Sequence, residues 1–417
     1  MNNKFFLLLL FFYSHGSFSQ DPVQNYSEAK PLGFAMPEGV EKVSIPFEIY
    51  NNLIVIDVLL NRSLPLKFVF DTGVRTTVLT EKALTDILNL KYSRKVTIPG
   101  AGGKKLVDAY VVNNVSLNVG RIQGNGHALL VLETDLLQLK NYLGVNVHGI
   151  LGYELFSRFV VDINYDKKTV TFHDPSTFKI RGRFVELPIS VEDTKPYLEA
   201  NFIIRGSEPI KGKFMMDTGA SHSMMLDGRS SEDIYVPEPN ISTTLGRGLA
   251  GDIFGEVARL DKMWVDKYVF EGVIATFPDA SSYEISLEQN FRNGTFGGGM
   301  MSRFRIIFDF VHSKIYVRKA SSFRRPFEYN LSGLIIKAKG IYLREYEIDD
   351  VREHSAAEQA GLKSGDEITK INGSSTKNLS LEEVTGMLSY KANKNIRMVI
   401  LRDGHMLHIR FKLSRLI

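Results

Sequence analysis

The sequence predicts a mostly β protein, made of two repeated lobes and a smaller β-rich domain with two helices. Three observations support this prediction. An apolar run that ends in Asp-Thr-Gly occurs twice, within Lys67–Leu79 and Lys213–Leu226. From Val43 onward, short runs of β-branched and aromatic residues alternate with Gly, Asn and Pro, which is typical of antiparallel strands and turns. Beyond about Phe327, capped helical segments interrupt the strand pattern.

The first residues have the form of a signal peptide, which we place at 1–19. A short charged start is followed by an apolar segment at Phe5–Tyr13 and by the small-x-small run Ser17–Ser19. The apolar segment is too short to cross a bilayer, and no later stretch reaches the roughly twenty residues that a transmembrane helix needs. Residues 20–42 are polar and hold three prolines, so they form either an extended arm or a short pro-segment.

Composition excludes several classes of function. The chain has no cysteine, which rules out disulfides, thiolate metal sites and cysteine nucleophiles. In an exported protein of 417 residues this absence indicates a bacterial periplasm or the extracellular space. The net charge of +4 is small and dispersed, so no nucleic-acid partner is expected. The nine histidines show no ligand spacing, so we expect neither a metal nor another cofactor.

The strand-like region divides into two lobes, at 43–175 and 185–320, joined by a charged connection. In lobe one, Asp166–Lys168 is a turn between the last two strands, and His312–Lys314 takes its place in lobe two. The one helical pattern lies at Thr80–Leu90, where Thr80 can cap and the apolar residues recur at helical spacing.

The two lobes repeat each other beyond the triplets. The segments His148–Phe159 and Asn293–Phe304 align without a gap, and both carry Gly followed later by Ser-Arg-Phe. A period of about 145 residues is too long for a solenoid repeat, so each copy should have its own core. We interpret this as an internal duplication that supplies two half-sites.

These motifs resemble those of the pepsin and retroviral aspartic proteases, over roughly residues 43 to 320. The resemblance implies two acid-protease-like lobes with a central cleft, and Asp71 and Asp217 as the catalytic pair. It also implies active-site loops completed by Thr72, Gly73, Thr218 and Gly219. A further loop backs each half-site, through Gly152 in lobe one and Gly297 in lobe two.

The chemistry explains these residue types. Two facing carboxylates cannot both ionise cheaply, so the pair shares one proton and supplies a base and an acid together. The base deprotonates a water and the acid protonates the peptide carbonyl. Each Thr can offer a hydroxyl that crosses to the opposite loop, and each Gly lets one backbone pass close to another.

Two Gly-rich hairpins resemble the flaps that close over substrate in retroviral-type proteases. They are Pro99–Gly103 and Gly246–Gly251, and the flap residues would be Gly102, Gly103, Gly248 and Gly251. The alternative is two ordinary turns. The first hairpin lacks the Lys-Ser/Thr ending of a phosphate-binding loop.

Some residues depart from the family pattern. Val74-Arg75 follows the first triplet, where the family carries small residues such as Ala220-Ser221 of lobe two. Thr295 replaces an aliphatic residue ahead of Gly297. Lobe one could therefore bind substrate differently or be catalytically weaker.

The C-terminal region at 327–415 resembles a PDZ domain of the kind found in bacterial proteases. The resemblance rests on the run from Ser355 to Gly373, with a Ser-capped helix and a Gly stop. A capping box at Ser380–Glu383 opens a second helix, and a hairpin turns at Asp403-Gly404. By position, Ser332, Gly333 and Leu334 would form the peptide-binding loop.

The sequence therefore predicts an exported aspartic endopeptidase that acts on peptides or proteins, with a PDZ domain that binds substrate or partner peptides. Because one chain supplies both half-sites, the catalytic unit should be monomeric and intramolecular. The alternative is a non-catalytic peptide-binding protein that retains the protease fold.

Overall fold

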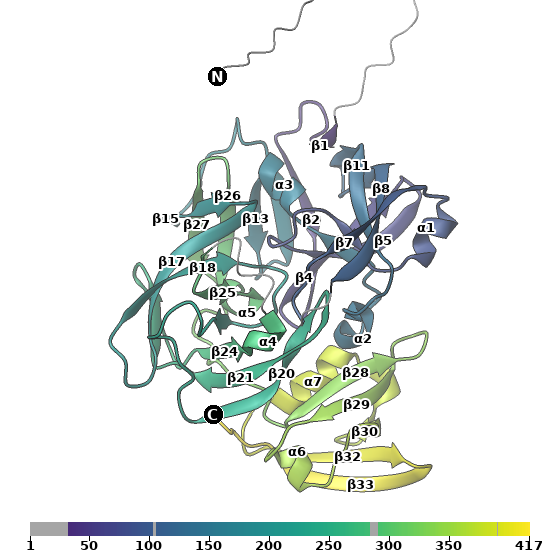
Figure 1. The fold of residues 1–417 in the computed structure, drawn as a ribbon, viewed down its shortest axis with the longest axis vertical. Helices are drawn as coiled ribbons and strands as arrows, with labels where there is room; N and C mark the ends of the chain where they lie inside the picture. The colour runs from purple at the N-terminus through teal and green to yellow at the C-terminus, as the bar shows by residue number, and fades with distance from the viewer. Residues whose placement is uncertain (1–31, 103–105, 284–290, 390) are drawn as a thin grey trace, which may run out of the picture. The chain divides into compact units, whose positions relative to one another are not determined.

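The computed structural model describes residues 32–102, 106–283, 291–389 and 391–417. The expected signal peptide at 1–19, residues 20–31 of the expected arm, and Gly103 lie outside the described residues. The fold is mostly β, which confirms the predicted class (Figure 1).

The sheet of lobe one has the strand order β3-β4-β5-β12-β6-β11-β8-β7, with β9 beside β4. Its parallel contacts, β12 with β5 and β6 with β11, lie at its centre. The strands are β3 (Glu48–Tyr50), β4 (Leu53–Leu60), β5 (Leu64–Phe70), β6 (Val78–Leu79), β7 (Tyr92–Ile98), β8 (Val107–Val115), β9 (Leu117–Asn118), β11 (His127–Leu132) and β12 (Gly149–Leu151). A separate pair is formed by β1 (Gly33–Ala35) and β10 (Gln123–Asn125).

The sheet of lobe two has the order β20-β21-β24-β19-β25-β18-β17-β22-β23, with β16 beside β17. Here β25 pairs in parallel with β18, and β24 with β19. The strands are β16 (Ser190–Glu192), β17 (Lys195–Ile203), β18 (Ile210–Met216), β19 (Met224–Leu226), β20 (Asn240–Gly248), β21 (Gly251–Arg259), β22 (Lys262–Val265), β23 (Tyr268–Glu271), β24 (Ile274–Pro278) and β25 (Gly294–Phe296).

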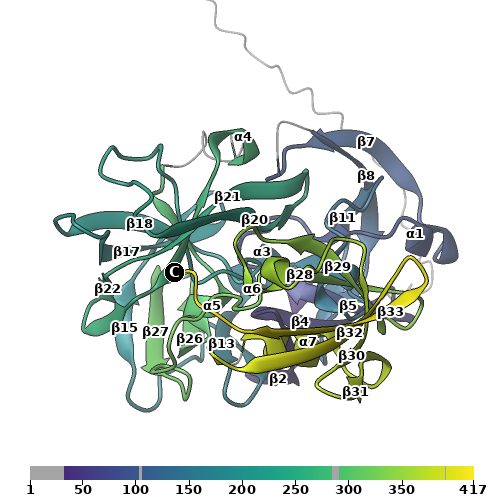
Figure 2. The ribbon, with the colours of Figure 1, turned by 90° about the horizontal axis from the view of Figure 1, so that it is seen from below.

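A third sheet joins the two lobes, with the order β15-β27-β26-β13-β14-β2. Its strands are β2 (Lys42–Pro46), β13 (Val160–Asn164), β14 (Thr169–His173), β15 (Val185–Pro188), β26 (Phe304–Asp309) and β27 (Lys314–Lys319). The lobes meet where β13 pairs antiparallel with β26, Val161 opposite Phe308 (Figure 2). Arg305 donates two hydrogen bonds to Asp162 across this junction. The proposed lobe boundaries remain predictions, because strands from both sides of the connection share this sheet.

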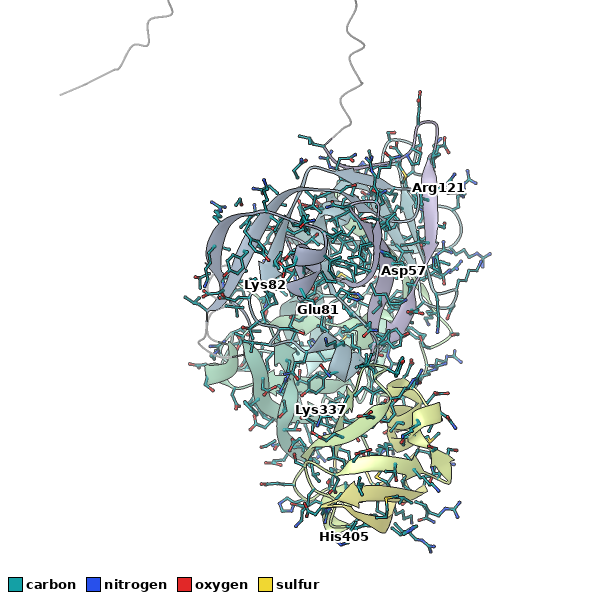
Figure 3. The ribbon with its side chains drawn as sticks, turned by 90° about the vertical axis from the view of Figure 1, so that its right-hand side faces the viewer. Asp57, Glu81, Lys82, Arg121, Lys337 and His405 are labelled. Atoms are coloured by element: carbon teal, nitrogen blue, oxygen red, sulfur yellow. The ribbon has the colours of Figure 1, made fainter. Side chains whose placement is uncertain are left out.

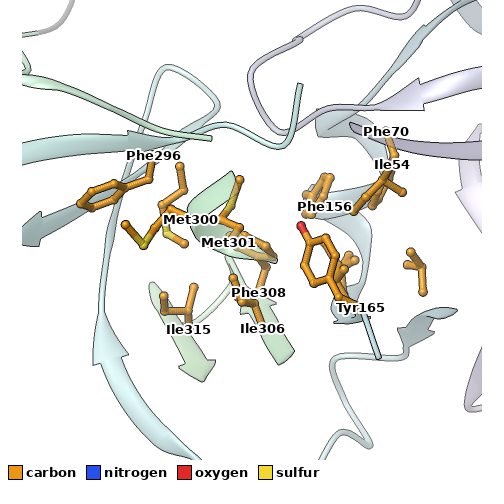
Figure 4. Close-up of a cluster of buried hydrophobic side chains, with 14 of the residues drawn as sticks. Ile54, Phe70, Phe156, Tyr165, Phe296, Met300, Met301, Ile306, Phe308 and Ile315 are labelled. Carbon is orange, nitrogen blue, oxygen red and sulfur yellow. The ribbon is translucent and has the colours of Figure 1, made fainter. Parts of the chain in front are cut away.

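One apolar core extends under both lobes. Its aromatic centre includes Phe156, which stacks on Phe70 and on Phe310 and meets Phe308 edge to face. Figure 4 shows the side chains of lobe one, such as Ile54 and Phe70, near those of lobe two, such as Phe308 and Met301. Burial of large aromatic rings gives each lobe a fixed platform for the loops above it.

Short helices lie between these strands. They are α1 (Ala83–Ile87), α2 (Leu139–Leu143), α3 (Tyr153–Arg158), α4 (Ala280–Tyr283) and α5 (Gly298–Met301). The expected helix at Thr80–Leu90 is real but shorter, and its cap was predicted wrongly. Lys82 is the N-cap residue and makes no side-chain capping bond. The backbone N–H of Thr80 instead donates to the carbonyl of His148, so Thr80 still belongs to the sheet region.

The C-terminal domain has its own core and a sheet with the order β28-β29-β30-β32-β33, with β31 beside β30. Its elements are β28 (Leu334–Lys339), β29 (Glu345–Val351), α6 (Ala356–Gln359), β30 (Glu367–Ile371), β31 (Ser374–Ser375), the 3₁₀ turn η1 (Thr376–Asn378), α7 (Leu381–Ser389), β32 (Asn395–Arg402) and β33 (His405–Lys412).

Local signals in this domain are confirmed. Ser355 caps α6 by accepting from the N–H of Glu358. Ser380 and Glu383 bond reciprocally in a capping box before α7. Asp403 and Gly404 both have positive φ, as a two-residue hairpin turn requires.

Candidate active site

The two Asp-Thr-Gly loops begin where a buried strand ends in each lobe. Strand β5 ends just before Asp71, whose N–H donates to the carbonyl of Leu151 at 2.9 Å. Strand β18 ends just before Asp217, whose N–H donates to the carbonyl of Phe296 at 2.9 Å. Each aspartate therefore leaves its strand beside a parallel neighbour that fixes the backbone.

The two threonines join the loops across the lobes. The N–H of Thr72 donates to Oγ1 of Thr218 at 3.0 Å, and the N–H of Thr218 donates to Oγ1 of Thr72 at 3.0 Å. Each hydroxyl then donates onward, from Thr72 to the carbonyl of Met216 at 2.6 Å and from Thr218 to that of Phe70 at 2.7 Å. Both threonines are buried, so the expected crossing of hydroxyls forms a closed network.

The two carboxylates share one small space. A Cβ built on Gly73 would lie 3.1 Å from Oδ1 of Asp71 and 3.1 Å from Oδ1 of Asp217. One built on Gly219 would lie 2.2 Å from Oδ2 of Asp71. A side chain at Gly219 would therefore overlap the opposite carboxylate, and one at Gly73 would crowd both carboxylates.

Backbone donors hold both carboxylates in place. The N–H of Gly73 donates to Oδ1 of Asp71 at 2.5 Å, and that of Gly219 donates to Oδ1 of Asp217 at 2.9 Å. Asp71 is 8% exposed, whereas Asp217 is half-buried. Burial raises the pKa of Asp71 well above its ordinary value, and the neighbouring Asp217 carboxylate raises it further. The raised pKa favours one proton held between the two carboxylates, an arrangement that offers an acid and a base together.

A glycine passes beside each triplet with no room for a side chain. A Cβ on Gly152 would lie 1.7 Å from the carbonyl oxygen of Asp71. One on Gly297 would lie 2.3 Å from the carbonyl oxygen of His222. The structure therefore places both predicted backing residues directly against the loops. Thr295, the unusual residue ahead of Gly297, is buried.

The two Gly-rich hairpins meet at their tips. The first is β7 and β8, and the second is β20 and β21. The N–H of Ala250 donates to the carbonyl of Ala101 at 2.9 Å, which joins the tips across the lobes. A Cβ at Gly102 or at Gly248 would overlap the backbone of the opposite tip. Gly251 has a φ of +119°, a backbone conformation that favours glycine. Their role as flaps remains a prediction.

Two tight turns, which were not predicted from the sequence, take part in contacts between the lobes. Nδ2 of Asn52 donates to the carbonyl of Ser221, just after the second triplet, at 2.9 Å. Nη1 of Arg75, just after the first triplet, is 3.5 Å from Oδ1 of Asp193. Asn51-Asn52 and Asp193-Thr194 have positive φ at both positions. That pattern of Asn and Asp was the available signal for such tight turns.

The departures in lobe one leave its triplet geometry unchanged. Val74 is partly buried, and its carbonyl accepts from the N–H of Tyr153 at 3.0 Å. The Arg75 side chain is 71% exposed and points to Asp193 rather than to the aspartates. The pKa of His222, three residues past the second triplet, is lowered to about 4 by burial. That ring is therefore neutral and adds no charge to the pair.

The predicted PDZ loop is already bonded within the chain. The N–H groups of Ser332 and Gly333 donate to Oδ1 of Asn330 at 3.0 and 3.2 Å. The N–H of Leu334 donates to Oγ of Ser332 at 3.1 Å. Ser332 and Leu334 are buried. The structure thus brings the three predicted residues together at the start of β28, with their N–H groups bonded to Asn330 and to Ser332.

Among the described residues, no helix is long and apolar enough to cross a membrane. In that same part of the chain, no group of three or more His, Cys, Asp or Glu side chains is placed to hold a metal ion.

Comparison with known families identifies two domains. An aspartyl protease family model matches residues 56–155, which include Asp71 and Gly152. A PDZ domain model matches residues 347–402. A search of curated proteins finds no match. The chain therefore contains an aspartyl protease domain and a C-terminal PDZ domain.

Proposed function

We propose that this chain, which carries an aspartyl protease domain and a PDZ domain, is an exported aspartic endopeptidase with a site formed by Asp71 and Asp217. One observation carries the proposal: both carboxylates lie within 3.1 Å of the same point beside Gly73, and burial raises the pKa of Asp71. Packing does not explain this pair, because two adjoining carboxylates destabilise each other. The activation of a water molecule does explain a pair of adjoining carboxylates.

In the proposed reaction, Asp71 carries the shared proton and Asp217 acts as the base. Asp217 takes a proton from a water molecule, and the hydroxide adds to the carbonyl carbon of the peptide bond. Asp71 gives its proton to the carbonyl oxygen, so the tetrahedral intermediate is a neutral diol. The diol then collapses. One hydroxyl proton returns to Asp71, the proton on Asp217 passes to the amide nitrogen, and the C–N bond breaks to give acid and amine.

The threonine network supports this assignment through preorganisation. A displacement of catalytic groups by about 1 Å can lower the rate about a hundredfold. The bonds between Thr72 and Thr218 fix the distance between the loops from both sides. We infer that the hairpins β7–β8 and β20–β21 act as flaps, which open to admit a peptide and then exclude water.

The proposal includes an internal duplication and an intramolecular site. Parallel pairing of β12 with β5 and of β25 with β18, and a glycine behind each triplet, support two copies of one unit. The PDZ domain would bind peptides from substrates or partners. Export rests on the sequence of residues 1–19.

The test is hydrolysis of an unfolded protein substrate by the natural chain and by Asp71→Asn and Asp217→Asn. Both variants should lose at least about three orders of magnitude in rate, because neither half-site can supply acid and base alone. Circular dichroism should show that both fold. A natural chain that binds unfolded protein without cleaving it would instead favour a non-catalytic peptide-binding protein.

A further inference from the structure

The short helix α2 of lobe one lies against the peptide-binding edge of the PDZ domain. Among the residues that the structure describes, β28 pairs with β29 alone, so its other edge has no strand partner. Nδ2 of Asn141 donates to the carbonyl of Ala338 on that edge at 2.8 Å. A Cβ built on Gly144, at the end of α2, would lie 2.6 Å from Cβ of Leu381, the first residue of α7. Figure 1 shows α2 beside α7 and beside β28, the strand to whose edge an extended peptide would add.

Tyr142, which follows Asn141 in α2, connects the PDZ domain to lobe two. The hydroxyl of Tyr142 donates to Oδ2 of Asp349 in the PDZ domain at 2.6 Å. The guanidinium of Arg247 lies 4.8 Å from the centre of the Tyr142 ring. Arg247 also binds Asp252 on the facing strand of its hairpin, with Nε to Oδ1 at 2.5 Å. Tyr142 thus contacts both the PDZ domain and the tip of the β20–β21 hairpin.

On the PDZ side of this contact, Asp349 and Arg352 each have further partners. Lys337 on β28 is labelled in Figure 3. Its Nζ lies 2.5 Å from Oδ1 of Asp349, so this one carboxylate accepts hydrogen bonds from both Lys337 and Tyr142. Arg352 stacks over Tyr329 at 4.6 Å, and its Nε lies 3.5 Å from Oγ1 of Thr243 on β20. Arg352 is 4% exposed. The PDZ domain therefore contacts the hairpin at Arg247 through α2 and at Thr243 directly.

We propose that the PDZ domain acts as a clamp: its peptide-binding edge docks on α2 and, through Tyr142, holds the β20–β21 hairpin closed. The closed state is the one in which Ala250 bonds to Ala101 of the opposite hairpin. An extended peptide that adds to β28 needs the carbonyl of Ala338, which Asn141 occupies. Docking and peptide binding exclude each other, so a bound peptide releases the hairpin and opens access to the aspartates.

The same geometry defines the kind of peptide. A PDZ loop that takes a chain terminus offers free N–H groups to the terminal carboxylate. Here those N–H groups donate to Asn330 and to Oγ of Ser332, which is buried. The releasing ligand is therefore an extended internal segment that pairs with the backbone of β28. An unfolded protein offers many such segments, so a substrate could open the enzyme that cleaves it.

The test compares two substitutions of Tyr142 in the full chain. Tyr142→Phe removes the bond to Asp349 and keeps the ring beneath Arg247, whereas Tyr142→Ala removes both. Amide hydrogen exchange is measured over the hairpin, residues 240–259. A hydrogen bond to a charged group stabilises by about 1.5–3 kcal/mol, or roughly tenfold or more in an equilibrium. We expect exchange about tenfold faster in Tyr142→Phe and faster still in Tyr142→Ala.

Tyr235→Phe is the matched control, because it removes a tyrosine hydrogen bond in lobe two, to the carbonyl of Arg205 at 2.9 Å. It should leave exchange in the hairpin unchanged. Tyr142→Phe preserves the ring and keeps the test available if Tyr142→Ala does not fold. Unchanged hairpin exchange in a folded Tyr142→Phe protein would overturn the clamp.

A second measurement uses a short quenched peptide, and only this arm rests on the proposed protease activity. Released variants should cleave it about three- to tenfold faster than the natural chain, and Tyr235→Phe should not. Faster exchange without faster cleavage, in an active enzyme, would show that the hairpin does not limit access. If neither the natural chain nor any variant cleaves the peptide, the proposed function fails. Hydrogen exchange over the hairpin still decides whether the clamp exists.

Discussion

Thr72 and Thr218 bond each other reciprocally, the N–H of each donating to the hydroxyl oxygen of the other at 3.0 Å. These two bonds help to set the distance between the loops that carry Asp71 and Asp217. Substitution of a single threonine tests their contribution.

Replacing Thr72 by Val should destabilise the protein by about 2–4 kcal/mol, because it leaves the N–H of Thr218 and the carbonyl of Met216 buried without their partner. Thr72→Ser keeps the hydroxyl and should cost less than about 1.5 kcal/mol. Urea unfolding measures both. Equal stability of the Ser and Val variants would show that the crossing bonds contribute little.

The raised pKa of Asp71 predicts a pH-dependent effect of Asp71→Asn on stability. Near pH 3 the carboxyl is protonated in folded and unfolded chains, so Asn should make little difference. As the pH rises past about 4, the unfolded chain releases its proton while the folded chain keeps it. The folded state then binds more protons, and stability falls with rising pH across the interval up to the raised pKa.

Thermal unfolding should therefore show Asp71→Asn to be more stable than the natural chain at pH 7, with the difference shrinking toward pH 3. The control is Asp86→Asn, since Asp86 is an exposed residue of helix α1 in lobe one. A stability difference for Asp71→Asn that does not depend on pH would contradict the assignment.

The intramolecular site predicts that two inactive chains cannot rescue each other. Asp71→Asn and Asp217→Asn proteins should remain inactive when mixed, because β13 and β26 of one chain already join its lobes. Tethered lobes also meet at an effective concentration on the order of millimolar. Recovery of activity in the mixture, measured by peptide hydrolysis, would require a site shared between chains.

Gly152→Ala should abolish folding or activity, because its Cβ would lie 1.7 Å from the carbonyl oxygen of Asp71. Gly386→Ala is the matched control. That glycine lies within helix α7 with open space around it, so alanine should stabilise the domain by roughly 0.5–1 kcal/mol. Circular dichroism and hydrolysis together measure the contrast, and an active Gly152→Ala enzyme would rule out the close approach.

The sequence was most informative where a local rule decides the structure. The capping box at Ser380 and the turn at Asp403-Gly404 depend on neighbouring residues alone, and both were predicted. The aspartate pair was predicted because Asp71 and Asp217 carry the same flanking pattern. One Asp-Thr-Gly triplet is a weak signal, but two copies with the same flanking pattern indicate a paired site.

Contacts that depend on tertiary structure could not be predicted. Helix α2 has Gln138 at its N-cap with a φ of +48° and no capping bond, so it left no signal in the sequence. Thr80 looked like a helix cap but bonds within the sheet region, because pairing with the His148 segment outweighs a local cap. The N–H groups of Ser332 and Gly333 donate to Asn330, and the types of these residues alone do not reveal that geometry.

The pairing of β13 with β26 has a consequence for biosynthesis. Val161 is translated long before its partner Phe308, so the edge of β13 stays unpaired while the ribosome completes lobe two. An exposed strand edge is a site for aggregation, and contacts so distant in sequence form slowly. A chain interrupted between these strands would present that edge permanently, so nascent or truncated forms should depend on chaperones far more than the finished protein does.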